Sequence, residues 1–187
     1  MEQRPAGVLM ARLIWLIGPS GSGKDSLLDL LREAPPDGLL IAHRYITRPH
    51  DVGGENHVAL TEAEFIRRKA LGLFAVSWQA HGFHYGIGSE IDGWLACGQN
   101  VLVNGSRQHL EQVRARYGAR LLPLCIEVSP LVLAARLRQR GRESEEEIVQ
   151  RLARAAQHQP EGCLRLNNDG ALVDTVQQLR QLLAEFP

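Results

Sequence analysis

The apolar run Leu13-Ile-Trp-Leu-Ile17 and the segment after it, Gly18-Pro-Ser-Gly-Ser-Gly-Lys24-Asp25-Ser26, decide the fold of this chain. The run has the composition of a buried strand, and the leucines up to Leu31 indicate a helix beyond the glycines. The segment matches the phosphate-binding pattern G-x-x-x-x-G-K-[ST] except at its last position, where Asp25 stands. Such glycines let backbone N–H groups turn towards a phosphate chain, and the lysine reaches the outer phosphates. We therefore expect a nucleoside triphosphate site formed by Gly18, Pro19, Ser20, Gly21, Ser22, Gly23, Lys24, Asp25 and Ser26.

The Asp at the last position of this pattern bears on a metal ion. A Ser or Thr hydroxyl ordinarily contacts Mg²⁺ at this point. A carboxylate is also a good ligand for a hard cation, either directly or through water. Alternatively, Asp25 caps the helix and Ser26 takes over the metal contact. The sequence leaves both open, so Asp25 and Ser26 are the candidate Mg²⁺ ligands.

The composition excludes several classes of protein. Hydrophobic residues make up 44% of the 187 residues and charged residues 22%, as in a globular domain. Acidic and basic residues balance at 21 each, so we expect no general attraction to nucleic acid or to an anionic membrane. The three cysteines are widely spaced, which favours a reducing cytoplasm over a disulfide framework. The sequence does not decide the oligomeric state and leaves a homodimer open.

Strand patterns alternate with helical patterns along the chain. Strands are expected at 13–17, 39–46, 74–78, 101–103, 121–128 and 164–166, and helices at 26–32, 61–69, 91–96, 106–117, 130–140, 144–157 and 171–186. The glycine-rich segment 81–88 is expected to form a loop. This alternation predicts an α/β fold with three α/β/α layers and a parallel central sheet, in a single domain over 1–187.

Arginines gather in the second half of the chain. Arg136 and Arg140 are spaced to share one helix face, and Arg142 follows a glycine. Arg151 lies on the next expected helix, so these cations could converge on a phosphate if the segment of about 136–154 closes as a lid. The alternative is a solvated basic face that is partly neutralised by neighbouring glutamates. Behind a phosphate-binding loop we favour the lid, because phosphoryl transfer depends on cations around the transferring group.

A second group of arginines follows the second expected strand. Arg48 stands in Thr47-Arg48-Pro49, at a strand end where open α/β sheets bind ligands. We expect Arg48 to bind a phosphate. Arg44 lies on the same strand, where a role in binding and simple surface charge are equally acceptable interpretations.

These motifs together resemble the guanylate kinase-like branch of the nucleoside monophosphate kinases. The resemblance covers nearly the whole chain: the GPSGSGKDS loop, Thr47-Arg48-Pro49, Tyr85-Gly86, the strand at 100–104 and the arginine segment. It implies a P-loop kinase that uses ATP and Mg²⁺, with an insertion at about 47–88 that binds the acceptor. It further implies that Arg136, Arg140 and Arg151 grip the triphosphate and that Arg48 grips the phosphate of the acceptor.

The chain departs from guanylate kinases where those enzymes recognise their acceptor. Asp51 stands at about the place of their second phosphate-binding arginine. Their guanine-reading glutamate is missing near Val76, and Ile87 replaces the hydroxyl residue that follows their Tyr-Gly pair. Because hydrogen-bond readout is the strong form of discrimination, a pocket without these groups has no evident way to select guanine.

The combination GPSGSGKDS, HRYITRP, HGFHYGIG and VLVNGSR resembles a branch of this family that serves bacterial phosphonate degradation. That resemblance implies a sugar bisphosphate acceptor, α-D-ribose 1,5-bisphosphate, and 5-phosphoribosyl 1-diphosphate and ADP as products. An acceptor phosphate with a second pKa of ~6 is mostly ionised at neutral pH, so no general base is required. The candidate acceptor contacts are Arg44, Arg48, His81, Tyr85, Asn104, Ser106 and Arg107.

One further residue and three other functions stay open at this stage. Asn168 follows the last strand and is a candidate adenine contact, with a simple turn asparagine as the alternative. The other functions are a kinase for GMP or another nucleoside monophosphate, a binding module that has lost catalysis, and a P-loop ATPase. The intact Lys24 and the arginines argue against loss of catalysis.

Overall fold

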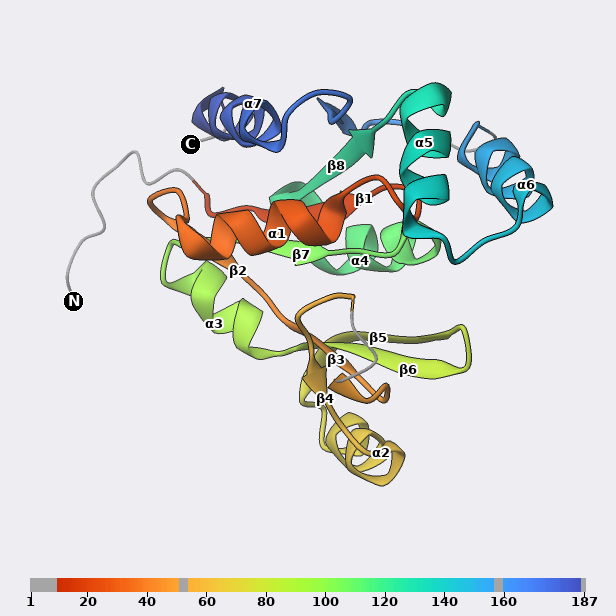
Figure 1. The fold of residues 1–187 in the computed structure, drawn as a ribbon. Coiled ribbons are helices and arrows are strands. Elements are labelled where there is room, and N and C mark those ends of the chain that lie inside the picture. Colours follow the sequence, from red (N-terminus) through yellow and green to blue (C-terminus); the bar gives the residue numbers. More distant parts are fainter. Residues whose placement is uncertain (1–9, 51–53, 157–159, 186–187) are drawn as a thin grey trace.

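The core of the molecule is a five-stranded parallel sheet; the computed structural model describes residues 10–50, 54–156 and 160–185 (Figure 1). Its strands are β1 (Leu13–Ile17), β2 (Leu39–Ile41), β7 (Asn100–Asn104), β8 (Leu121–Glu127) and β9 (Leu164–Asn167). Their order is β2-β7-β1-β8-β9, and every neighbouring pair is parallel. Parallel strands bring their carboxyl ends to one edge of the sheet, and the phosphate-binding loop follows β1 at that edge.

Helices cover both faces of this sheet, because the central strand is apolar on both sides. Ile14 and Leu16 pack under α1 (Lys24–Glu33) and α7 (Leu172–Glu185). Leu13, Trp15 and Ile17 face the other way, towards α3 (Glu90–Ala96) and α4 (Leu110–Tyr117). The three-layer α/β/α architecture expected from the sequence is confirmed.

A second sheet of four strands lies below the core sheet in Figure 1 and shares with it an apolar cluster that includes Trp15 and Trp78. It has the order β4-β3-β6-β5, and α2 (Glu62–Ala70) packs beside it through Phe65, whose ring stacks on Phe74. The β3–β6 and β5–β6 pairs are antiparallel, whereas β4 runs parallel to β3. The strands are β3 (Arg44–Ile46), β4 (Val58–Ala59), β5 (Phe74–Ala80) and β6 (Phe83–Gly88).

Two of the expected elements in this region are wrong. The single strand at 39–46 is two strands in different sheets, because the chain leaves the core after Ala42 and pairs Arg44 with Ile87. The expected loop at 81–88 is strand β6 over most of its length. Glycine serves packing there, since a Cβ at Gly86 would come within 2.7 Å of the Phe74 ring.

Two helices follow β8 and lie side by side: α5 (Pro130–Arg140) and α6 (Glu145–Ala156) (Figure 1). The side chain of Ser129 caps α5, and Gly141 ends that helix in the left-handed conformation, with φ of 63°. Ser144 and Glu147 form a reciprocal capping box at the start of α6, as their spacing predicts. Two short 3-10 segments, η2 (Arg107–His109) and η3 (Gly118–Arg120), flank α4, so the helix expected at 106–117 begins as a 3-10 turn.

Within the described ranges, the helices are all too short or too polar to cross a membrane.

Candidate active site

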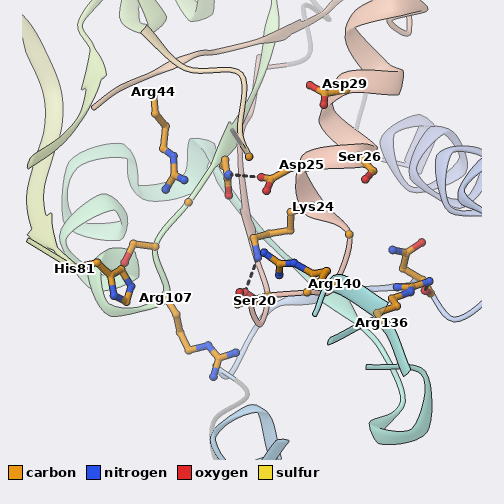
Figure 2. A pocket seen from close by; sticks show the side chains of 18 of the residues that line it. Ser20, Lys24, Asp25, Ser26, Asp29, Arg44, His81, Arg107, Arg136 and Arg140 are labelled. Carbon is orange, nitrogen blue, oxygen red and sulfur yellow. Dashed lines mark hydrogen bonds between the residues drawn. The ribbon is translucent and has the colours of Figure 1, made fainter. Parts of the chain in front are cut away.

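A cavity of about 930 Å³ separates the carboxyl edge of the core sheet from the small sheet. The phosphate-binding loop lines its floor, and the C-terminal part of α5 and the loop after β9 line one side. The small sheet and the loop after β7 line the opposite side. In Figure 2, Arg44, His81 and Arg107 lie to the left of Lys24, and Arg136 lies to its right.

The loop adopts the strained turn that its glycines allow. Gly21 and Gly23 have φ of 88° and 89°, a region that L side chains rarely adopt. Gly18 lies so close to β8 that a Cβ there would meet the Ile126 side chain at 2.3 Å. The Ser22 side chain is fully buried, and its hydroxyl oxygen has no hydrogen-bond partner among the described residues. The shape of this loop therefore depends on glycine at positions 18, 21 and 23.

Lys24 closes the mouth of the loop. Its Nζ donates to the carbonyl oxygens of Gly18 at 2.7 Å and Pro19 at 3.0 Å. Burial lowers the pKa of the ammonium group to about 8, and the nearby Asp25 opposes that shift. The lysine is thus a poorly solvated cation beside the cavity, where an anion would stabilise its charge.

Asp25, labelled in Figure 2, and Asn104 both line the cavity and form a hydrogen bond with each other. Asn104 Nδ2 donates to Asp25 Oδ1 at 3.4 Å, and the Asn104 Oδ1 is buried without a partner among the described residues. Burial raises the pKa of the Asp25 carboxyl, and the negative charge of Glu55 raises it further. A cation beside the Asp25 carboxyl would offset the effect of its burial and of the Glu55 charge.

Asn168 and Arg136 fasten the loop after β9 to the phosphate-binding loop. Asn168 Nδ2 donates to the carbonyl oxygen of Ser22 at 2.7 Å, and its Oδ1 accepts from the Thr175 hydroxyl at 2.7 Å. Arg136 Nη2 donates to the backbone oxygen of Asn168 at 2.7 Å. Asn168 is therefore more than a turn residue, and it also lines the cavity.

Two arginines on the small-sheet side of the cavity differ in their hydrogen bonding. Arg44 pairs side-on with the buried Glu55 carboxylate, its Nε lying 2.7 Å from Oε1 and 2.9 Å from Oε2, and its guanidinium lies over the Tyr85 ring. Arg48 lines the same cavity, and its buried Nε has no partner among the described residues. Arg44 is thus a fixed cation and not a free surface charge, and Arg48 keeps a donor unused.

The structure gathers most of the residues that the sequence singles out. The cavity is lined by Gly18, Ser20, Gly21, Gly23, Lys24, Asp25, Ser26, Arg44, Arg48, His81, Tyr85, Asn104, Ser106, Arg107, Arg136, Arg140 and Asn168. Pro19 and Ser22 instead supply carbonyl oxygens to Lys24 and Asn168. Arg151 is not at the cavity wall, because its Nη2 pairs with Glu143 at 3.2 Å.

The guanylate kinase family model matches residues 10–185 of the chain. The chain belongs to the guanylate kinase family. Among solved structures, a guanylate kinase from Anaplasma phagocytophilum matches with a TM-score of 0.69 at 15% identity, over 95% of this chain and 87% of its own. A gluconokinase from Sinorhizobium meliloti 1021 matches with a TM-score of 0.52 at 20% identity, over 95% of this chain and 94% of its own. These two likenesses support the fold.

Curated relatives in this family are much more similar. A protein from Pantoea vagans, named ribose 1,5-bisphosphate phosphokinase PhnN, is 75% identical over 93% of this chain and 98% of its own length. Proteins with the same name from Dickeya zeae and Yersinia pestis are 60% and 59% identical, over 94% and 93% of this chain and 94% and 92% of theirs. The chain is therefore a kinase.

The two positions at which guanylate kinases carry guanine-reading groups are apolar in this chain, as the sequence indicates. Val76 and Ile87 are cross-strand partners, with exposed fractions of 3% and 0%, and both belong to an apolar cluster with Trp78 and Tyr85. Neither Val76 nor Ile87 lines the cavity. Asp51, the third departure noted in the sequence, lies outside the described residues.

Sequence reasoning misses two residues on the side of the cavity that the small sheet forms. Trp78 lines the cavity and stacks on Tyr85 at 5.6 Å between ring centroids, with an interplanar angle of 4°. Glu55 lies in a polar segment with no motif, and only its burial against Arg44 identifies it. Trp78 could have been found from its position in β5, two residues before the cavity-lining Ala80, whereas no local signal marks Glu55.

Proposed function

We propose that this kinase transfers the γ-phosphoryl group of ATP to the 1-phosphate of α-D-ribose 1,5-bisphosphate, in the degradation of phosphonates. The products are 5-phosphoribosyl 1-diphosphate and ADP. One observation carries the proposal. The side of the cavity that includes Arg44, Arg48 and Tyr85, which we call the acceptor wall, presents cations. The positions where guanylate kinases read guanine, Val76 and Ile87, are part of the apolar core behind it. The names of the relatives, at up to 75% identity, support the same substrate.

On the donor side, we assign the triphosphate of ATP to the phosphate-binding loop. Its backbone N–H groups and the N-terminus of α1 favour anions, and Lys24 is a cation with little solvation of its own. Arg136 and Arg140 line the adjoining wall and would neutralise charge on the outer phosphates. With the triphosphate placed in this way, the adenine of ATP would lie against Asn168 and the loop after β9.

The floor of the cavity fits a magnesium ion. Asp25 and the unpartnered Asn104 Oδ1 are oxygen groups of the type that Mg²⁺ prefers, and Ser26 lies beside them. Mg²⁺ bound with ATP would neutralise part of the charge on the outer phosphates. We therefore assign Asp25, directly or through water, as the main protein contact of the ion, with Ser26 as the alternative.

On the acceptor side, we assign the two phosphates of the sugar to cationic and hydroxyl groups. Arg48 offers an unused buried donor, and Arg44 is held rigidly by Glu55. The remaining contacts come from the tip of the β5–β6 turn, from β6 and from the end of β7. These residues are His81, Tyr85, Asn104, Ser106 and Arg107.

The reaction then needs positioning more than proton transfer. An ionised oxygen of the 1-phosphate attacks the γ-phosphorus of ATP in line, and the bond from γ-phosphorus to the oxygen that bridges it to the β-phosphorus breaks. No proton has to be removed, because a phosphate monoester with a second pKa of ~6 is already largely dianionic. The cations from the loop and from α5 stabilise the charge that spreads over the transferred group.

Arg151 joins this scheme only if α6 moves. In the structure its guanidinium is held by Glu143, whose side chain is 6% exposed. We keep it as a lid residue that would exchange Glu143 for a phosphate when the segment 136–154 closes. The free thiols Cys97, Cys125 and Cys163 are consistent with action in the cytoplasm.

Phosphorus NMR of the purified protein with ATP and Mg²⁺ tests this function, with ribose 1,5-bisphosphate or GMP as acceptor. We expect the diphosphate resonances of 5-phosphoribosyl 1-diphosphate and no consumption of GMP. Formation of GDP alone would make the protein a divergent nucleotide kinase. Silence with both acceptors would favour a binding module, and ATP hydrolysis at a rate independent of acceptor would favour an ATPase.

A further inference from the structure

A buried histidine next to the acceptor wall has no role in the function described so far. His57 is 3% exposed and lies just before β4. Its Nδ1 is 2.8 Å from the backbone oxygen of Glu55, and its Nε2 is 2.9 Å from the backbone oxygen of Arg48. Carbonyl oxygens only accept hydrogen bonds, so a ring nitrogen bonds its carbonyl when it carries a proton, and both bonds form together when both nitrogens do. The ring thus ties together two backbone points that are separated along the chain.

Both of these points belong to residues that shape the acceptor wall. The Arg48 backbone carries the arginine whose Nε is buried and unpaired among the described residues. The Glu55 backbone carries the carboxylate that grips Arg44 side-on. Gly54 lies against Arg48 as well, since a Cβ there would stand 3.8 Å from Arg48 Nη2. The segment Gly54–His57, which we call the clamp, therefore touches both acceptor arginines.

We propose that His57 is a positioning residue for the acceptor: its two ring nitrogens fix the clamp so that Arg44 and Arg48 face the cavity at a set spacing. This inference rests on the proposed function, because it takes these two arginines as the groups that bind the acceptor's phosphates. A bisphosphate binds best when its two cationic partners are held before it arrives, since ordering them on binding costs affinity. The clamp thereby selects for an acceptor with two phosphates.

In the described part of the chain, no hydrogen bond or ion pair joins the clamp to the phosphate-binding loop, on which only the charge of Glu55 acts. His57 bonds only to the two backbone oxygens among the described residues, and the ring of His50 stacks on it at 5.5 Å between centroids. The phosphate-binding loop is instead held by Asn168 and Arg136. Loss of the His57 bonds should therefore weaken use of the acceptor and leave use of ATP intact.

Three substitutions separate the two bonds. His57→Ala removes both, His57→Gln places an amide near the Nε2 position, and His57→Asn places one near the Nδ1 position. We expect His57→Ala to raise KM for ribose 1,5-bisphosphate about tenfold or more, with KM for ATP within about twofold of wild type. We expect His57→Gln, which keeps the bond to the Arg48 carbonyl, to recover more of the loss than His57→Asn.

The matched control is His84→Gln on the same small sheet. Its ring contacts Gln79, Glu62 and Phe65 and does not line the cavity, so we expect both KM values to match wild type. Thermal unfolding of every variant shows whether it is folded. Either of two results for a folded His57→Ala protein would overturn the proposal. One is a fall in kcat together with equal rises in the KM values for acceptor and ATP, and the other is an unchanged KM for the acceptor.

The failure of the proposed function shows itself separately, in the wild type. If wild-type protein phosphorylates GMP and not ribose 1,5-bisphosphate, the proposed substrate is wrong. The same variants are then measured with GMP, whose single phosphate would still bind at Arg48. A selective rise in KM for GMP in His57→Ala would support the role of His57 at Arg48, and no rise would overturn it.

Discussion

Asn168 donates its side-chain amide to the carbonyl oxygen of Ser22 at 2.7 Å and thereby joins the last strand of the core sheet to the phosphate-binding loop. The Thr175 hydroxyl orients that amide from α7 by donating to its Oδ1 at 2.7 Å. Gly23 is part of the same contact, because a Cβ there would lie 2.5 Å from Asn168 Nδ2. The shape of the loop thus depends on a residue that lies more than a hundred positions further along the chain.

Asn168→Ala should weaken both the fold and the binding of ATP. The substitution removes the shorter of the two hydrogen bonds made by the Ser22 carbonyl and by the Thr175 hydroxyl, which keep Arg136 Nη1 and the Asn167 carbonyl as partners. Two lost hydrogen bonds cost about 1–3 kcal/mol in the free energy of unfolding. We expect KM for ATP to rise about tenfold while KM for the acceptor changes little. Urea unfolding and steady-state kinetics measure the two effects.

Thr175→Val is the control for this prediction. It removes only the hydroxyl that orients Asn168 and leaves the bond to Ser22 available. We expect a loss of stability with a smaller change in KM for ATP. If Asn168→Ala left KM for ATP at the wild-type value, the link between the two loops would have no part in nucleotide binding.

The pKa of Lys24 predicts how ATP use depends on pH. Burial lowers this pKa to about 8, so the unliganded enzyme loses the ammonium charge as pH rises through that value. Because kcat/KM reports the free enzyme, kcat/KM for ATP should fall above about pH 8. Bound phosphates favour the charged lysine, so kcat should stay level to higher pH.

Lys24→Arg serves as the matched variant for the pH profile. A guanidinium stays charged throughout the accessible range, so the alkaline fall in kcat/KM should disappear even if the rate is lower. Stopped assays across pH 6–10, expressed per folded enzyme, give both profiles. An identical alkaline fall in Lys24→Arg would assign it to another group.

Arg48→Ala and Lys24→Ala should separate the acceptor from the donor. Arg48 lines the acceptor wall with an unpaired Nε, so its loss should raise acceptor KM strongly and leave ATP binding near wild type. Lys24 contacts the loop carbonyls, so its loss should reduce phosphoryl transfer with every acceptor. Calorimetry with ATP and kinetics with ribose 1,5-bisphosphate compare them. Equal acceptor affinity in Arg48→Ala and wild type would remove Arg48 from the site.

Local patterns in the sequence predict the core of the fold well. The strand, glycine loop and helix around Lys24, and the capping box of Ser144 and Glu147, each depend on neighbours within a few residues. The division of 39–46 into two strands is not local. It depends on Arg44 pairing with Ile87, more than forty positions away. The polar pair His43 and Arg44 interrupts the apolar run where it divides, but it does not show which strand the second half joins.

The candidate site divides in the same way. Motif spacing finds the loop residues and Arg48, because those positions are part of recurring patterns. It misses Glu55 and His57, whose importance arises from burial in the folded chain. The glycines of β6 mislead for a related reason, since Gly86 makes room for the Phe74 ring and does not mark a turn. A residue that acts through a distant contact carries no local signal.

Restoring a guanine-reading carboxylate at position 76 should fail. Val76 is 3% exposed and packs with Ile87, Trp78 and Tyr85, so Val76→Glu would bury an unpaired carboxylate in an apolar cluster. We expect the free energy of unfolding to fall by about 3 kcal/mol or more, and no turnover of GMP. Val76→Thr, which buries a hydroxyl of similar volume, should cost less. Urea unfolding and a GDP-forming assay test both variants. A stable Val76→Glu protein that phosphorylates GMP would mean that this wall opens onto the cavity, and that one side chain, more than the surrounding core, sets the choice of acceptor.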